Sequence, residues 1–125
     1  MVDGPFYPNH PDLENKIISH LGTAWNPASG GSHQHGTKMA GVAAADIDNG
    51  LGIASIGYNT SLITSNNYNG PTPPSPHPFD NASSRTQRML YLAQNFPQVK
   101  VLTHSRKDPC YFIQANALVY EEIWN

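Results

Sequence analysis

Cysteine is almost absent from this sequence, because Cys110 is the single cysteine in 125 residues. One cysteine cannot form a disulfide within the chain, so a fold held together by internal disulfides is excluded. Charge is scarce as well: Asp, Glu, Lys and Arg make up 13% of the residues, against about a quarter in typical soluble domains. The formal net charge is −2 and no basic cluster occurs. We therefore expect neither nucleic acid nor a membrane surface as a partner.

Long apolar runs are also missing. No stretch approaches the roughly 18 consecutive apolar residues that indicate a transmembrane helix. The segment from Met1 to Pro8 lacks the charged start and apolar centre of a signal peptide, so none is expected there. The lone cysteine does not fix a compartment either, and the localisation stays unknown at this point.

Glycine and proline, by contrast, are plentiful, and they predict many turns. The clearest loop is Asn66 to Asp80, which carries five prolines between Pro71 and Pro78. Because these residues cannot donate to a helix or a ladder, we expect this loop to be irregular and exposed. A surface insertion and a polyproline ligand for a partner are the two interpretations. A second loop, Asn26 to Gln34, immediately precedes His35.

Hydrophobic patterns predict alternating strands and helices. Small apolar residues favour a helix over Gly36 to Ala45 that is buried on most of its faces. The other expected elements are a short strand at Ser61 to Thr64, a helix starting at 80–84 and ending before Pro97, a strand at Val99 to Thr103 and a helix at Phe112 to Trp124. This order predicts an α/β fold with a parallel sheet.

The segment from His35 to Gly41 is the sharpest candidate for chemistry. It places a histidine at the start of a helix, directly after a flexible loop, which suits a general base. One alternative is a purely structural histidine beside a helix cap. Another is a metal site with His33 and His35 as two ligands, completed by His10, His77 or Asp12, although no helical His-x-x-x-His pattern supports it.

This segment resembles a known family. His-Gly-Thr-x-x-Ala-Gly at 35–41 is similar to the signature around the catalytic histidine of the subtilases, the subtilisin-like serine peptidases, and the likeness continues through 42–45 and 48–54. Upstream, His10 to Leu13 resembles the His-Pro-Asp-Leu that follows the catalytic aspartate of that family. Counting back places Asp3 at the aspartate position, with Gly4-Pro5 where the family has Ser/Thr-Gly. The interval from Asp3 to His35, 35 − 3 = 32 residues, is also usual for subtilisins.

The resemblance implies a fold and a function. The fold would be an α/β, doubly wound parallel sheet, with residues 1–125 forming a partial, subtilase-like domain. The activity would be that of a serine endopeptidase, in which Asp3 and His35 are two members of an Asp-His-Ser triad. The family's Gly-Thr-Ser-x-Ala nucleophile motif occurs nowhere in the chain, so the serine and the oxyanion asparagine would lie beyond Asn125.

The partners implied are a polypeptide substrate and the remaining C-terminal part of the protease domain. Members of the family are often secreted. Two alternatives stay open beside the endopeptidase: a non-catalytic, subtilase-like binding module that keeps the cleft, and an unrelated α/β domain that binds a metal.

Two further sites follow from the resemblance. The stretch Val101 to Ser105 is similar to the family's strand that pairs with substrate, which makes Ser105 a substrate-binding candidate. Asp12 and Asp48 are similar to positions that hold a structural Ca²⁺ in many subtilisins, and oxygen ligands suit that cation. The alternative for both aspartates is a solvated acidic turn. The triad chemistry itself requires no cofactor.

Overall fold

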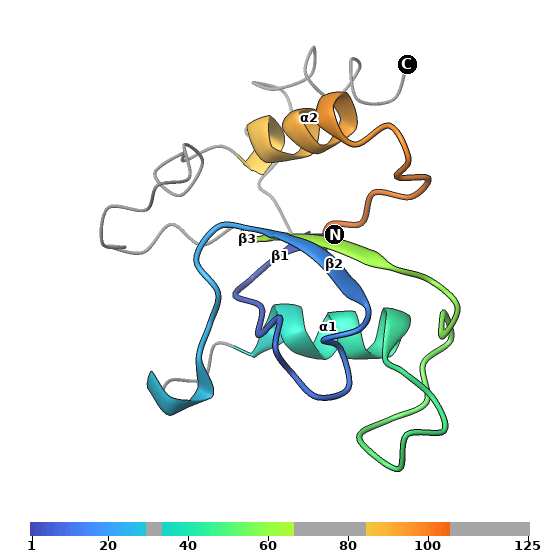
Figure 1. Ribbon diagram of the computed structural model, residues 1–125. Coiled ribbons are helices and arrows are strands. Elements are labelled where there is room, and N and C mark those ends of the chain that lie inside the picture. Colours follow the sequence, from blue (N-terminus) through green and yellow to red (C-terminus); the bar gives the residue numbers. More distant parts are fainter. Residues whose placement is uncertain (30–33, 67–84, 106–125) are drawn as a thin grey trace.

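The computed structural model of the protein describes residues 1–29, 34–66 and 85–105 (Figure 1). In this part of the chain it contains three strands, two α-helices and one 3-10 helix. The elements are β1 (Val2–Asp3), β2 (Ile17–Leu21), η1 (Pro27–Ser29), α1 (His35–Ala44), β3 (Leu62–Asn66) and α2 (Arg85–Asn95).

The three strands form one parallel sheet in the order β1-β3-β2. The register pairs Val2 with Ser65 and Asp3 with Asn66. Because all three strands run the same way, their carboxyl ends meet at one edge. The expected α/β fold with a parallel sheet is therefore confirmed, and the helices lie on opposite faces of the sheet (Figure 1).

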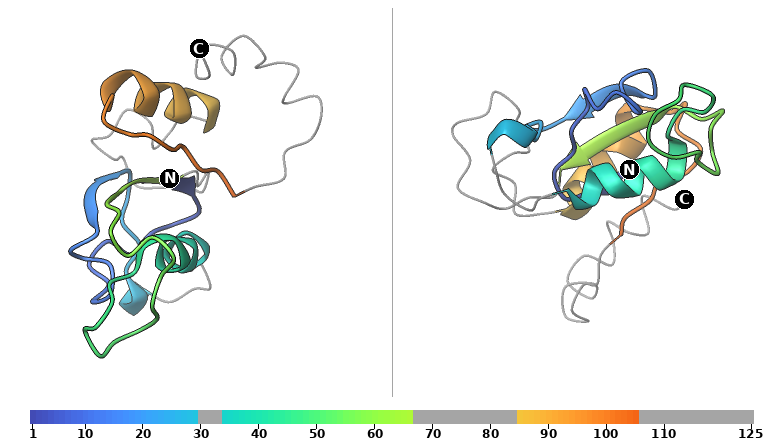
Figure 2. Two further views of the ribbon diagram at one scale, coloured as in Figure 1. Left: turned by 90° about the vertical axis from the view of Figure 1, so that its right-hand side faces the viewer. Right: turned by 90° about the horizontal axis from the view of Figure 1, so that it is seen from below.

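Each face of the sheet has its own apolar cluster, because successive strand residues point to opposite sides. Leu62 of β3 packs with the cluster on the α1 side, and its neighbour Ile63 belongs to the cluster on the α2 side. The buried members on the α1 side are Phe6, Leu13, Ala40 and Ala45. Those on the α2 side are Val2, Ile63, Met89 and Leu92. Figure 2 shows the sheet between the two helices from two further directions.

Helix α1 approaches the sheet through a stripe of small residues. Gly36, Ala40 and Ala44 recur every four positions and are buried, which is the spacing of one helix face. Val42, on another face, is half exposed. The helix therefore lies where the sequence predicts it, but the expected burial on most faces is wrong.

Other expectations are corrected by the structure. Residues Ile17–Leu21, for which no element was expected, form β2, and Asn66 ends a buried strand instead of opening a loop. The expected strand Val99 to Thr103 is absent from the described part, where only an isolated bridge joins Val2 to His104. Helix α2 ends at Asn95, before Pro97 as expected. The rest of the proline-rich loop and the helix at 112–124 lie outside the described residues.

Candidate functional site

Asp3 stands at the carboxyl end of β1, and its side chain is only 2% exposed. The Oδ1 atom accepts a hydrogen bond from the backbone N–H of Gly4 at 2.5 Å. The same oxygen lies 2.5 Å from Nδ1 of His35. The Oδ2 atom is buried, and the described residues offer it no hydrogen-bond partner. The orientation of the carboxylate thus depends on contacts made by one oxygen.

His35 is the first residue of α1, and its side chain is 61% exposed. The Asp3 carboxylate can only accept when ionised, so it favours the proton on Nδ1 of a neutral imidazole. That tautomer leaves a lone pair on Nε2, for which no hydrogen bond is recorded within the described residues. A ring held by a buried carboxylate at one nitrogen and open at the other can accept a proton from a bound group.

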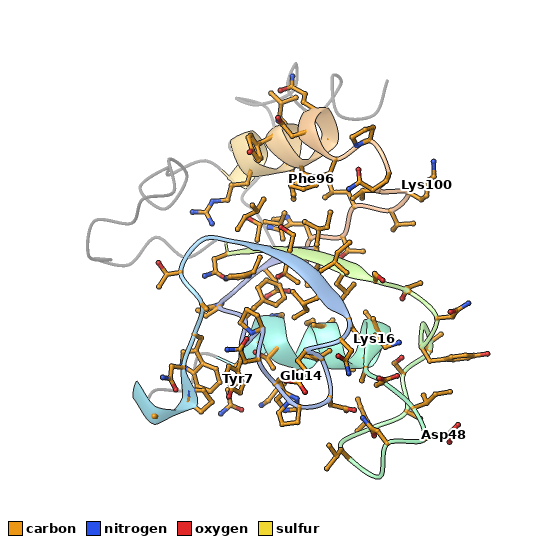
Figure 3. All side chains as sticks on the ribbon, in the orientation of Figure 1. Tyr7, Glu14, Lys16, Asp48, Phe96 and Lys100 are labelled. Atoms are coloured by element: carbon orange, nitrogen blue, oxygen red, sulfur yellow. The ribbon has the colours of Figure 1, made fainter. Side chains whose placement is uncertain are left out.

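The segment after Asp3 sets the distance between the two side chains. A Cβ atom built on Gly36 would overlap the carbonyl oxygen of Gly4 and lie 2.9 Å from that of Pro5. Only glycine allows the start of α1 to approach this backbone so closely. The hydroxyl of Thr37 accepts a hydrogen bond from the N–H of Tyr7 at 2.9 Å, and Tyr7 lies at the end of α1 where the helix begins (Figure 3).

Ser105 lies at the same end of the sheet as Asp3. Val2 pairs with His104 in parallel, and its N–H donates to the Thr103 carbonyl at 2.9 Å. Ser105 is the next residue after this bridge and is exposed. A backbone that leaves the sheet edge here is accessible, but its role in binding a substrate stays a prediction.

The two calcium candidates have different surroundings. Asp12 is 4% exposed, and its carboxylate accepts from the Asn49 side chain at 2.8 Å and from the Ile53 N–H at 3.1 Å. Asp48 is exposed on the outer part of the loop that connects α1 to β3 (Figure 3), and its backbone has a positive φ of 60°. Both Asp12 oxygens therefore already serve the loop.

Within the described ranges, no three His, Cys, Asp or Glu side chains gather in a way that could hold a metal ion. No such cluster therefore supports the calcium site expected at Asp12 and Asp48, and that site stays a prediction. For the alternative metal site, His33 and His77 lie outside the described residues. His10 accepts from the Asp12 N–H through Nδ1 at 3.2 Å.

A groove of about 690 Å³ lies beside α1, between the helix, the Tyr7 to Leu13 segment and Trp25. Neither Asp3 nor His35 lines it. The Asp3–His35 pair therefore lies at the edge of the sheet and outside this groove.

Neither helix of the described part is long and apolar enough to cross a membrane.

Asn66 belongs to the surroundings of this site, although no sequence motif pointed to it. It is 5% exposed at the end of β3, opposite Asp3 in the register. Its Oδ1 accepts from the Phe6 N–H at 3.3 Å, and its Nδ2 donates to the Thr23 carbonyl. A polar residue closing a buried strand is the signal that could have identified it.

Comparison with known proteins gives a partial similarity. A thermophilic serine proteinase from Bacillus sp. (strain AK1) is 37% identical over 57 residues. The matched part covers 43% of this chain and 14% of that protein. No family model matches the chain, and no solved structure matches it either. The similarity indicates a relationship to a serine proteinase over part of the chain.

Proposed function

We propose that this chain supplies the aspartate and the histidine of a subtilisin-like serine endopeptidase, with the nucleophilic serine located beyond Asn125. The observation that carries the proposal is the 2.5 Å separation between Asp3 Oδ1 and His35 Nδ1, which joins a buried carboxylate to an exposed imidazole. The partial similarity to a serine proteinase supports the same chemistry. So do the parallel sheet and its helices on both faces, which are compatible with an incomplete, doubly wound subtilisin-like domain.

The two residues would divide the acid–base work. Nε2 of His35 takes the proton of the serine hydroxyl while Oγ attacks the carbonyl carbon of the scissile peptide. The same proton then passes to the leaving amine, which breaks the C–N bond and leaves an acyl-enzyme that water hydrolyses. The Asp3 carboxylate keeps the ring in the productive tautomer and stabilises the imidazolium. Ser105, at the neighbouring strand end, would contact the polypeptide substrate.

The chain from Met1 to Asn125 should not hydrolyse peptide or ester substrates by itself. Triad catalysis needs a hydroxyl placed against His35 and donors for the oxyanion, and this sequence carries neither family motif. Incubation with a serine-directed phosphonate, followed by intact-mass measurement, is expected to leave the chain unlabelled. Stoichiometric labelling of a serine within residues 1–125 would reveal a nucleophile that this proposal does not contain.

The decisive experiment uses the longest product encoded by the gene. If the proposal holds, the phosphonate labels one serine beyond Asn125, and His35→Ala lowers the labelling rate by about 10³-fold or more. Lys38→Ala, an exposed position on the same helix, serves as the matched control and should label normally. A stop codon after Asn125 would favour the non-catalytic binding module, and labelling that does not depend on His35 would contradict the assignment of His35 to the triad.

A further inference from the structure

We infer that Asn66 is a positioning residue for the Asp3–His35 pair. The carboxamide acts through the backbone that follows Asp3, without touching the imidazole. Its relevance to catalysis rests on the proposed function, whereas its effect on the geometry of the pair does not.

The first step of the argument is the position of Asn66 in the sheet. It is the register partner of Asp3, so the two residues end adjacent parallel strands at one edge. Asn66 is 5% exposed, and a buried amide is costly unless both its ends are hydrogen-bonded. Here the Oδ1 accepts from the Phe6 N–H at 3.3 Å and the Nδ2 donates to the Thr23 carbonyl.

These two bonds join the segments that leave β1 and β2. The Phe6 carbonyl completes the link, because it accepts from the Trp25 N–H at 2.6 Å. Phe6 is therefore held at its N–H by Asn66 and at its carbonyl by the segment after β2, while its ring is fully buried. The chain between Asp3 and Phe6 is fixed at both ends.

The fixed segment contains the atoms that orient the pair. The Gly4 N–H donates to Asp3 Oδ1, and Oδ2 has no partner within the described residues. The carbonyls of Gly4 and Pro5 pack directly on Gly36, the residue after His35. A shift of this turn therefore moves the carboxylate and the start of α1 relative to each other.

The first readout needs no activity. In the 125-residue chain with ¹⁵N-labelled histidine, the ring signals of His35 should report mainly the Nδ1–H tautomer held by Asp3. The near-isosteric Asn66→Leu variant removes both hydrogen bonds and should shift His35 toward a mixture of tautomers. Ser55→Ala is the matched control, because Ser55 is also buried and its hydroxyl donates to the Ala45 carbonyl at 2.7 Å, away from the pair. Ser55→Ala should lower the free energy of unfolding but leave the His35 signals unchanged.

The second readout applies to the longer gene product. Asn66→Leu should lower the phosphonate labelling rate on the order of 10²-fold, the effect of a displacement of about 1 Å in a catalytic group. Asn66→Gln, which keeps the carboxamide, should recover part of the rate. The folded fraction of each variant is measured by urea unfolding, so rates are compared among folded molecules.

Each outcome decides one idea. If His35 keeps its tautomer and its labelling rate in folded Asn66→Leu, the positioning role is wrong while the proposed function stands. If the tautomer shifts but no serine labels in any form of the protein, the positioning role stands and the proposed function is wrong. If Asn66→Leu does not fold, folded Asn66→Gln decides: His35 signals that shift partway toward a tautomer mixture support the role, and wild-type His35 signals at a reduced stability overturn it.

Discussion

The contact between Gly36 and the Gly4–Pro5 backbone makes a sharp prediction about stability. In Gly36→Ala, the added Cβ would overlap the Gly4 carbonyl oxygen and lie 2.9 Å from the Pro5 carbonyl oxygen. Both obstacles are backbone atoms, so neither can rotate away as the end of a side chain could. The new methyl group can be accommodated only if the start of α1 moves away from β1.

The size of the effect follows from two opposing contributions. Overpacking of a close contact typically costs about 1–3 kcal/mol, and replacing glycine by alanine in a helix returns at most about 1 kcal/mol. We expect Gly36→Ala to lower the free energy of unfolding by about 1–2 kcal/mol. Gly41→Ala in the same helix is the control, because its Cβ would meet nothing closer than the Ile53 Cδ1 atom at 3.8 Å. That variant should be neutral or more stable by up to about 1 kcal/mol.

Urea unfolding followed by far-UV circular dichroism measures both variants. With a slope of roughly 1–3 kcal/mol per molar urea, the midpoint of Gly36→Ala should fall by about 0.3–2 M, and that of Gly41→Ala should not fall. Histidine ring NMR of Gly36→Ala should also show His35 losing its single tautomer. If Gly36→Ala proves as stable as Gly41→Ala and keeps the tautomer, the close approach does not set the geometry of the pair.

Three further predictions concern the loop around Asp12 and the start of the chain. Gly52→Ala should lower the free energy of unfolding more than Gly50→Ala, as measured by urea unfolding. Both residues have positive φ, but a Cβ on Gly52 would also overlap the Asp12 carboxylate, whereas a Cβ on Gly50 meets open space. Equal losses of stability in the two variants would contradict the prediction. If Asp12 and Asp48 hold calcium, adding Ca²⁺ should raise the midpoint of urea unfolding and Asp12→Asn should abolish that rise; a midpoint that does not respond to Ca²⁺ would contradict the site. In a chain that begins at Met1, burial lowers the pKa of the α-amino group from 8.0 to about 6, an effect that Asp3 partly opposes. The unfolded chain then binds more protons between these values, so stability should fall by on the order of 2 kcal/mol as the pH drops from 8 to 6; an N-terminally acetylated chain is the control, and identical pH profiles would contradict the prediction.

The adjacency of Asp3 and His35 could be predicted because the motifs around the two residues, in their order and interval, resemble those of the subtilases, and the structure confirms the contact. Asp3 ends β1 and His35 begins α1, so the two motifs bring a strand end and a helix start together. Helix α1 was predictable because small apolar residues fill most of Gly36 to Ala45, although the single buried stripe at Gly36, Ala40 and Ala44 emerged only from the structure. The coarse α/β architecture followed from the alternation of such segments.

Strand β2 was hidden because its pattern is ambiguous. Ile17, Ile18 and Leu21 are apolar, but Ser19 and His20 interrupt them, so neither alternation nor a continuous apolar run is present. The structure explains the irregular pattern, because the register with β3 shifts between Ile17 and Ser19 and leaves Ile18 61% exposed. The opposite error occurred at 99–103, where β-branched residues suggested a strand but only one bridge to β1 forms. Propensity cannot decide such cases, because pairing depends on a partner elsewhere in the chain.

The support of the candidate site lay furthest from what sequence can predict. Asp3 is followed by Gly4-Pro5, where the subtilases that the segment resembles have Ser/Thr-Gly, so the sequence offers the aspartate no obvious side-chain donor. The structure supplies the Gly4 backbone N–H instead, and a backbone donor is not encoded by any particular side chain. What holds that backbone is a carboxamide 60 positions away from Phe6 in sequence. Local pattern identifies the groups that could react, but their orientation is set by long-range hydrogen bonds. Variants that preserve the Asp3 and His35 side chains while breaking those bonds, Asn66→Leu above all, are consequently the most direct test of how this site is built.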